Sequence, residues 1–315
     1  MSSFELKHLK ALLAVAEQGS FNRAAAALQT GQPAISKSIA LLERAARVPL
    51  FERGPRGAVL TPAGEILTRT AAAMVHLIED AVEDIEALAQ GGAGRLIVGA
   101  TPSTTMGLVP LACSRLGSRI RNAELIIREG LDTDLLPALE RGEIDLLVGP
   151  VADLQALPQH LVEATLFEEG LSIGVRPGHP LAKRESVTLG ELVEAAWIMP
   201  VAGSKFHQLV EAMFLASALP WPTNIITTNS LAAQEIIALD SDRLLLTTGI
   251  QYVARSSALA VIPVQGSPRR RIGWRRLKKL RPSPLLDAFI EELGAVIACT
   301  ASQSVTTGPT SGMAD

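Results

Sequence analysis

The chain has 315 residues, of which 48% are hydrophobic and 19% are charged, and its formal net charge at pH 7 is −3. This composition excludes a low-complexity or disordered chain and suggests two or three packed domains. The first 60 residues carry eight basic and four acidic side chains, a local net charge of +4, so affinity for phosphates is expected there and not over the whole surface. No export signal opens the sequence, and prolines and threonines interrupt its least charged run, residues 96–114. We therefore expect a cytoplasmic protein.

Three helices are expected within the first 44 residues. The first, residues 6–17, has an apolar face at helical spacing. The second, residues 23–28, could be capped by Asn22. The third, residues 32–44, has Pro33 in its first turn, where a missing N–H costs no hydrogen bond. Short helices joined by a tight turn indicate a helix-turn-helix, although they also occur as packing units that bind no DNA.

The third helix would bury its apolar residues and turn a small, polar face outward. Small side chains let a helix approach the major groove, where an amide, a hydroxyl and an ammonium group can reach bases or phosphates. A turn with two arginines follows between apolar runs and indicates a two-stranded wing within residues 50–60. The residues expected to contact DNA are Asn22, Gln32, Pro33, Ser36, Lys37, Arg53 and Arg56.

This segment resembles the amino-terminal domain of LysR-type transcriptional regulators. The similarity lies in Gly19-Ser20-Phe21, in Gln32-Pro33-Ala34-Ile35-Ser36 and in Leu60-Thr61-Pro62-Ala63-Gly64, and it continues more loosely to about residue 298. Two departures are Gly31, where the family usually has a serine, and Ala46-Arg47, where it usually has Leu-Gly. The resemblance implies operator or promoter DNA and a small-molecule effector as partners, a homodimer or homotetramer, and RNA polymerase as a further candidate partner.

A long helix is expected to follow, with Thr61 as its cap and Pro62 in its first turn. Its apolar residues alternate at spacings of four and three, a heptad seam whose partner should be a second copy of the helix. A single helix packed on its own domain is the alternative. The seam consists of Leu67, Ala71, Met74, Ile78, Ala81, Ile85 and Leu88.

Strand and helix patterns alternate after a glycine-rich hinge at residues 90–94, which is typical of parallel α/β sheets covered by helices. The resemblance implies two lobes with a periplasmic-binding-protein-like fold. The expected strands are 95–100, 124–128, 144–149, 171–175, 197–199, 225–228, 244–247, 259–264 and 271–276, and the expected helices are 103–116, 134–141 and 284–298.

The fold class is thus α/β, with an N-terminal winged helix-turn-helix, a linker helix and a two-lobe effector domain. The expected domains are the DNA-binding domain at 1–61, the dimerisation helix at 62–90, the effector-binding domain at 91–298 and a disordered tail at 299–315. Lobe I would comprise 95–168 and 268–298, and lobe II would comprise 169–267.

Ligands of such sheets bind outside the carboxyl ends of the strands, between the lobes. Hydroxyl groups and free amides follow several expected strands and could bind an anion, such as an aromatic or sugar carboxylate, although Ser and Thr also cap helices. Lys205 and His207 could supply positive charge. The candidate effector-binding residues are Thr101, Ser103, Thr104, Gly203, Ser204, His207, Thr228, Asn229 and Thr248.

Other features suggest no further chemistry. Cys113 and Cys299 are far apart and form no metal or redox motif. The basic run at 269–281 could be a charged sheet edge, a solvated loop or a DNA contact. Motifs of catalytic nucleophiles, zinc proteases and phosphate loops are absent from the sequence, so we expect no enzyme activity, metal or cofactor. Two alternatives remain, a small-molecule-binding α/β protein or enzyme without a specific DNA role, and another class of winged-helix regulator.

Overall fold

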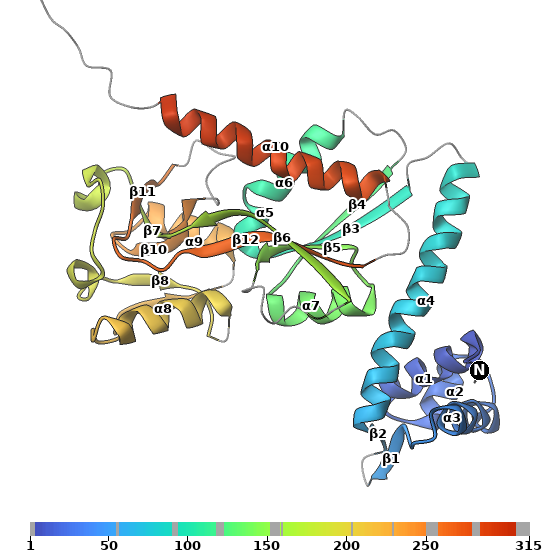
Figure 1. The fold of residues 1–315 in the computed structure, drawn as a ribbon. Coiled ribbons are helices and arrows are strands. Elements are labelled where there is room, and N and C mark those ends of the chain that lie inside the picture. The colour runs from blue at the N-terminus through green and yellow to red at the C-terminus, as the bar shows by residue number, and fades with distance from the viewer. Residues whose placement is uncertain are drawn as a thin grey trace, which may run out of the picture. The chain divides into compact units, whose positions relative to one another are not determined.

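Three helices, a short two-stranded ribbon and a long helix open the chain in the computed structural model (Figure 1). The structure describes residues 4–54, 57–89, 94–117, 123–151, 158, 160–202, 204–228, 230–249, 258–278 and 284–306. The chain divides into two units, residues 1–91 with 137–143, and residues 92–136 with 144–315.

The first unit is a winged helix-turn-helix with its own apolar core. In that core Leu12 and Val15 of the first helix pack with Ile39 and Leu42 of the third. The two wing strands are antiparallel, and Phe51 pairs with Leu60. Glu43 ties the third helix to the wing, because its Oε1 accepts a hydrogen bond of 2.9 Å from the backbone N–H of Leu50. The elements are α1 (Leu6–Gln18), α2 (Phe21–Ala27), α3 (Gln32–Ala46), β1 (Phe51–Gly54), β2 (Gly57–Leu60) and α4 (Pro62–Ala89).

Asn22 does not cap the second helix, so this sequence prediction was wrong. Gly19 ends α1 in a left-handed conformation with φ of 60°, and Ser20 is extended, with φ of −155°. The chain has therefore turned by Ser20, and α2 begins at Phe21, which places Asn22 inside the first helical turn. Thr61 behaves as predicted for α4, because its Oγ1 accepts a hydrogen bond of 3.0 Å from the N–H of Gly64.

Arg47 ends α3 in the left-handed conformation, with φ of 59°. A side chain with a Cβ is strained there by about 1–2 kcal/mol, whereas glycine is not. Replacing Arg47 with glycine should raise the free energy of unfolding of the first unit by about 0.5–1 kcal/mol, since glycine's greater unfolded-state entropy offsets part of the gain. Differential scanning calorimetry would measure this. Arg47→Ala is the control, because it removes the charge and keeps the strain; equal stabilisation by both variants would contradict the explanation.

The apolar residues of α4 divide into two groups. Ala71 and Val75 are buried in the core of the first unit, and Leu67 packs against it. This part of the predicted seam therefore faces its own domain, as the alternative had it. Six other large apolar side chains of α4 are exposed and form what we call the α4 stripe: Ile66, Met74, Leu77, Ile78, Val82 and Ile85. The side chain of Leu88, the last residue of the predicted seam, is outside the described part of the helix.

The second unit contains two five-stranded sheets with helices against them, and one of these helices, α7 (Asp132–Arg141), ends in residues that belong to the first unit. Its elements are β3 (Gly94–Ala100), α5 (Pro102–Thr105), α6 (Leu108–Leu116), β4 (Ala123–Glu129), α7 (Asp132–Arg141), β5 (Leu146–Pro150), β6 (Leu161–Glu169), β7 (Leu171–Val175), η2 (Pro180–Lys183), η3 (Leu189–Leu192), β8 (Trp197–Met199), α8 (Lys205–Ala216), β9 (Ile225–Thr227), α9 (Leu231–Leu239), β10 (Leu244–Thr248), β11 (Ala260–Pro263), β12 (Arg270–Leu277) and α10 (Pro284–Thr306).

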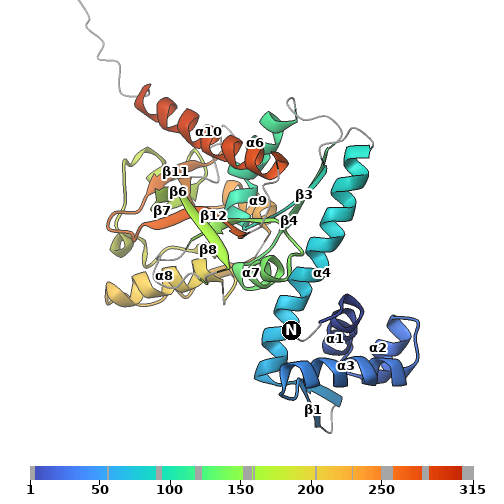
Figure 2. The same cartoon turned by 45° about the vertical axis from the view of Figure 1, so that its right-hand side comes forward.

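The lobe I sheet has the strand order β4-β3-β5-β12-β6. β3 is parallel to β4 and β5, as predicted, but β12 is antiparallel to β5 and β6. β12 corresponds to the predicted returning segment, which comes back from lobe II and enters the sheet in the opposite direction. β6 was not predicted at all. In both Figure 1 and Figure 2, α6 and α10 lie side by side on one face of this sheet.

The lobe II sheet has the strand order β11-β7-β10-β8-β9, and its β7 is antiparallel to both neighbours. The prediction of a parallel sheet was therefore wrong for β7, which follows β6 directly with no helix between them to return the chain. Alternate residues of β8 face opposite sides of the sheet. Trp197 packs edge-on against Phe214 of α8, whereas Ile198 packs with Ala238 of α9. Helices therefore cover both faces, and the loops at the carboxyl ends of the parallel strands stay at the edge of the sheet.

The last helix, α10, continues to Thr306, eight residues beyond the predicted end at 298. The remainder of the predicted tail, 307–315, lies outside the described residues. Within the described residues, no helix combines the length and the apolar character needed to cross a bilayer.

Candidate DNA-binding and effector-binding sites

The outer face of α3 is the candidate DNA-reading surface. Ile35, Ile39 and Leu42 are buried on the opposite face, which fixes the orientation of the helix. Gln32, Pro33 and Lys37 are exposed and Ser36 is half-buried. Gln32 Nε2 donates a hydrogen bond of 2.8 Å to Ser36 Oγ, so the amide is held over the first turn of the helix.

The other predicted DNA-contacting residues lie outside α3. Asn22 is exposed on α2, and Arg53 belongs to the first wing strand. Arg56 lies outside the described residues.

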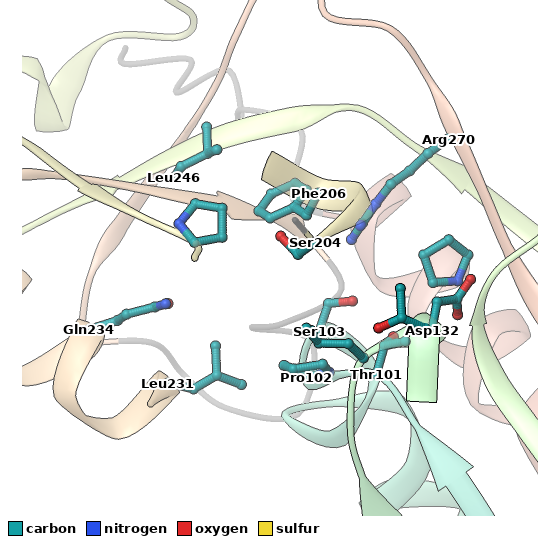
Figure 3. Close-up of a pocket in the computed structure, with 14 residues that line it drawn as sticks. Thr101, Pro102, Ser103, Asp132, Ser204, Phe206, Leu231, Gln234, Leu246 and Arg270 are labelled. Carbon is teal, nitrogen blue, oxygen red and sulfur yellow. The ribbon is translucent and has the colours of Figure 1, made fainter. Parts of the chain in front are cut away.

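A pocket lies between the two lobes of the second unit, at the carboxyl ends of several strands (Figure 3). The space within the pocket and at its opening amounts to about 770 Å³. We call it the interlobe pocket. Its described lining residues are Thr101, Pro102, Ser103, Leu131, Asp132, Thr133, Pro150, Pro200, Ser204, Phe206, Leu231, Gln234, Leu246 and Arg270.

Three predicted effector residues line this pocket: Thr101, Ser103 and Ser204. Thr101 and Ser103 follow β3, and Ser204 caps α8 by accepting a hydrogen bond of 3.1 Å from the N–H of His207. The two lobes thus present hydroxyl groups to the same cavity from the ends of different strands.

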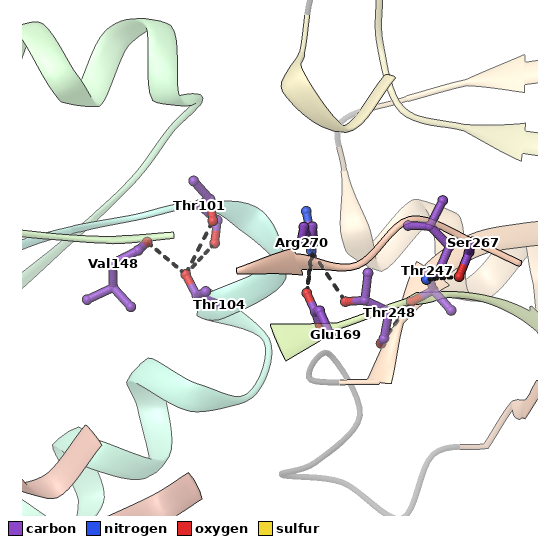
Figure 4. Close-up of polar contacts among 9 residues, drawn as sticks. Thr101, Thr104, Val148, Glu169, Thr247, Thr248, Ser267 and Arg270 are labelled. Atoms are coloured by element: carbon purple, nitrogen blue, oxygen red, sulfur yellow. Dashed lines mark hydrogen bonds and ion pairs between the residues drawn. The ribbon is translucent and has the colours of Figure 1, made fainter. Parts of the chain in front are cut away.

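Thr104 and Thr248 are fully buried beside the pocket and are engaged with the protein (Figure 4). The Thr104 hydroxyl lies 2.9 Å from the carbonyl oxygen of Thr101 and 3.1 Å from that of Val148, so it ties α5 to β5. Thr248 Oγ1 lies 3.5 Å from Nη2 of Arg270.

The remaining predicted effector residues have other surroundings. The His207 ring lies 5.5 Å from the ring of Trp221, within lobe II. Thr228 Oγ1 accepts a hydrogen bond from the N–H of Ser230 at the start of α9. Gly203 and Asn229 lie outside the described residues.

Among the described lining residues, the sequence reasoning missed two charged side chains, Asp132 and Arg270. Arg270 Nε and Nη2 both donate to Glu169 Oε1, at 2.9 and 2.6 Å, and the guanidinium carbon lies 4.7 Å from the centre of the Phe206 ring. Figure 4 shows the contacts that run from the guanidinium of Arg270 to Glu169 and to Thr248. The only available signal was the basic run itself, which does not identify the partner of any one arginine.

The basic run forms ion pairs with the neighbouring strand. Arg269 pairs with Glu168 and Arg270 pairs with Glu169. Arg275, which is 4% exposed, pairs with Glu163 at 2.5 Å and with Asp132 at 3.5 Å. Because β12 lies between β5 and β6, the prediction of a charged sheet edge was wrong. The ion pairs hold Arg270 and Arg275 nearly buried, so these two arginines are not available as a DNA-binding surface.

Burial raises the pKa of the Cys113 thiol, which keeps it protonated at neutral pH and lowers its reactivity. Cys299 is exposed on α10. Within the part of the chain that the structure describes, no group of three or more His, Cys, Asp or Glu side chains is placed to hold a metal ion.

Two protein families match the chain. The family described as bacterial regulatory helix-turn-helix protein, lysR family, matches residues 6–65. The family described as LysR substrate binding domain matches residues 89–298. The first match covers the winged helix-turn-helix and the start of α4, and the second covers both lobes and their interlobe pocket.

Individual proteins and structures agree with these matches. YdcI of Escherichia coli, an uncharacterized HTH-type transcriptional regulator, is 30% identical over 83% of this chain and 85% of its own. PcaQ of Agrobacterium fabrum, also an HTH-type transcriptional regulator, is 30% identical over 83% of this chain and 84% of its own. The crystal structure of CbnR, a LysR family transcriptional regulator, has a TM-score of 0.61 at 19% identity, over 93% of this chain and 99% of that chain, and a second structure holds CbnR in complex with its target DNA. At this identity the structural similarity shows the shared fold.

Proposed function

The chain belongs to the LysR family of transcriptional regulators, and on that premise we propose that α3 and the wing read an operator whose occupancy responds to a small anionic effector in the interlobe pocket. The observation that carries the proposal is the pairing of two surfaces in one chain. A polar helix face lies on a unit with net positive charge in its first 60 residues, and a cavity lined by hydroxyl groups from two lobes lies in the other unit.

The α4 stripe supports a dimer as the DNA-binding form. Six large apolar side chains exposed along one helix are typical of an interface. Two copies joined through α4 would hold two recognition helices at half-sites about one helical turn, ~34 Å, apart. We further propose that dimers pair into a tetramer, that the regulator acts in the cytoplasm with RNA polymerase as a partner, and that it catalyses no reaction.

An effector would act by favouring one arrangement of the two lobes. A ligand shifts such an equilibrium only through its different affinities for the two arrangements, and such coupling is typically ~1–3 kcal/mol. β6 and β12 connect the lobes, so they are the strands that a change in lobe arrangement would bend. The domains proposed for these roles are residues 1–61, 62–90 and 91–298.

Fluorescence anisotropy with DNA from upstream of the protein's own gene would test the proposal. We expect tighter binding to this DNA than to a scrambled duplex of equal length, and a steep decrease in affinity as salt rises, because Lys and Arg displace counterions from phosphates. Equal, weak binding to both duplexes across the salt series would contradict the DNA-reading role.

Two substitutions on α3 should separate base reading from phosphate binding. Gln32→Ala should relax specificity by ~1–3 kcal/mol, because an amide can pair with a base edge. Lys37→Ala should weaken binding to every sequence and reduce the salt slope by about 1, because an ammonium group binds phosphate without reading sequence. The same anisotropy assay would measure both variants. Equal losses on operator and scrambled DNA for both would contradict this division.

A further inference from the structure

The two lining charges of the interlobe pocket indicate the chemistry of its ligand. Arg270 comes from β12, where the chain crosses back to lobe I, and Asp132 begins α7. Among the described residues that line the pocket, these two carry the only formal charges. Both side chains are nearly buried, so bulk water screens neither charge strongly. A ligand between them meets a cation and an anion at separate places.

Arg270 is held in a fixed orientation with donors to spare. Glu169 occupies the Nε and Nη2 side of the guanidinium, and the Phe206 ring lies against its face. Nη1 makes no hydrogen bond with the described residues. A planar guanidinium that is already oriented loses little entropy when it binds a carboxylate, and Nη1 can donate a charge-assisted hydrogen bond to it.

Asp132 favours the opposite kind of ligand group, a hydrogen-bond donor and not an anion. Its carboxylate is 3.5 Å from Arg275, and Arg275 also pairs with Glu163 at 2.5 Å. A second carboxylate of a ligand near Asp132 would be repelled at low effective dielectric. A hydroxyl or another hydrogen-bond donor there would be attracted.

The rest of the described lining is mostly apolar. Leu131, Leu231 and Leu246 join three prolines and Phe206 around the cavity (Figure 3). Such walls can contact a hydrocarbon or aromatic body.

We propose that the effector is an apolar, aromatic monocarboxylate with a hydrogen-bond donor, that Arg270 binds its carboxylate, and that Asp132 accepts from the donor and rejects dicarboxylates. Glu169 is a positioning residue that orients Arg270 and competes for its charge. This inference rests on the proposed role of the pocket as the effector site.

Isothermal titration of the full-length protein would test it with four probes: benzoate, 4-hydroxybenzoate, benzamide and terephthalate. Wild type should bind 4-hydroxybenzoate most tightly, then benzoate, and should bind benzamide and terephthalate at least about tenfold more weakly than benzoate, since charge-assisted hydrogen bonds are roughly twice as strong as neutral ones. Failure of both monocarboxylates to bind, or a preference for terephthalate, would overturn the proposal.

Matched variants assign the effect to Arg270. Arg270→Gln should weaken benzoate binding at least about tenfold, because it removes the charge-assisted pair. Arg269→Gln should leave the affinity within about twofold, because Arg269 pairs with Glu168 outside the pocket. Equal affinities of wild type and Arg270→Gln for benzoate would refute the proposal that Arg270 binds the carboxylate.

Glu169→Gln keeps Arg270 and serves if Arg270→Gln does not fold. It should raise benzoate affinity several-fold by removing a competing charge, whereas Glu168→Gln should not. An unchanged or lower affinity in Glu169→Gln overturns the assignment of Arg270 as the carboxylate-binding residue.

Asp132→Asn should reduce the discrimination against terephthalate, and unchanged discrimination would overturn the role of Asp132. DNA binding measured on the same preparations separates the two proposals. If benzoate binds in an Arg270-dependent way but the protein shows no preference for the operator, only the regulatory role is contradicted.

Discussion

Replacing Arg275 with methionine is expected to lower the free energy of unfolding of the second unit by about 3–5 kcal/mol, because it would leave buried carboxylates without their cation. The guanidinium donates from Nε to Glu163 at 2.5 Å and from Nη2 to the carbonyl oxygen of Pro150 at 2.8 Å, and Nη1 lies 3.5 Å from Asp132. Methionine fills a similar apolar volume, so the loss would come from charge and hydrogen bonds more than from packing.

Urea denaturation of the full-length protein, with the transition of the second unit followed by tryptophan fluorescence, would measure the loss. All three tryptophans of the sequence, including the buried Trp197, lie in that unit. Arg269→Met is the control, because Arg269 and Glu168 are exposed and such pairs contribute only about 0–1 kcal/mol. Equal losses of unfolding free energy in the two variants would show that the buried ion pairs of Arg275 contribute no more to stability than the exposed pair of Arg269.

The double variant Arg275→Met, Glu163→Met distinguishes lost charge balance from lost packing. Removing both partners of a buried pair is much less harmful than removing one, so the double variant should recover a large part of the lost stability. Recovery would be incomplete because Asp132 remains. A double variant no more stable than Arg275→Met would instead assign the loss to the packing of the arginine stem.

The residues that follow the strands could be predicted from the sequence, because the position of each strand depends on the local pattern of apolar and polar residues. The parallel-sheet rule placed ligands outside the carboxyl ends of strands, and Thr101, Ser103 and Ser204 do line a pocket there. Arg270 and Asp132 could not be assigned in this way. Arg270 meets Glu169 from 101 residues away, and Arg275 meets Asp132 from 143 residues away.

β6 was missed for a related reason. Its sequence, LVEATLFEE, alternates apolar and acidic residues only in part, and the acids look like a solvated segment when considered alone. Their partners are the arginines of β12, in the register Arg270 to Glu169 and Arg275 to Glu163. Two segments that looked like surface charge in isolation are thus adjacent strands.

The α4 helix shows a question that the spacing of apolar residues does not answer. Spacings of four and three residues identify apolar faces but not the surface that each face contacts. Ala71 belongs to the predicted seam and is buried in its own domain, whereas Ile78, from the same seam, is exposed. The helix is long enough to serve both purposes, since its first turns complete the winged domain and its later turns extend beyond that core.

Placing a charge within the α4 stripe should therefore separate the copies of the protein. Ile78 is 44% exposed in the single chain, and Ile78→Glu would bury an unpaired carboxylate in a helix pair. We expect analytical ultracentrifugation to show dissociation of the α4-linked pair. Operator affinity should fall by a factor of about 10²–10⁴, because the second half-site would no longer be bound by a linked recognition helix.

Leu215→Glu is the matched control, because Leu215 of α8 is an even more exposed apolar side chain, at 82%, and lies outside the stripe. It should leave both the α4-linked pair and the operator affinity unchanged. If Ile78→Glu instead keeps the pair intact and binds the operator as wild type does, the α4 stripe is not the dimer interface. The two recognition helices would then have to be held at their half-sites by contacts between effector domains.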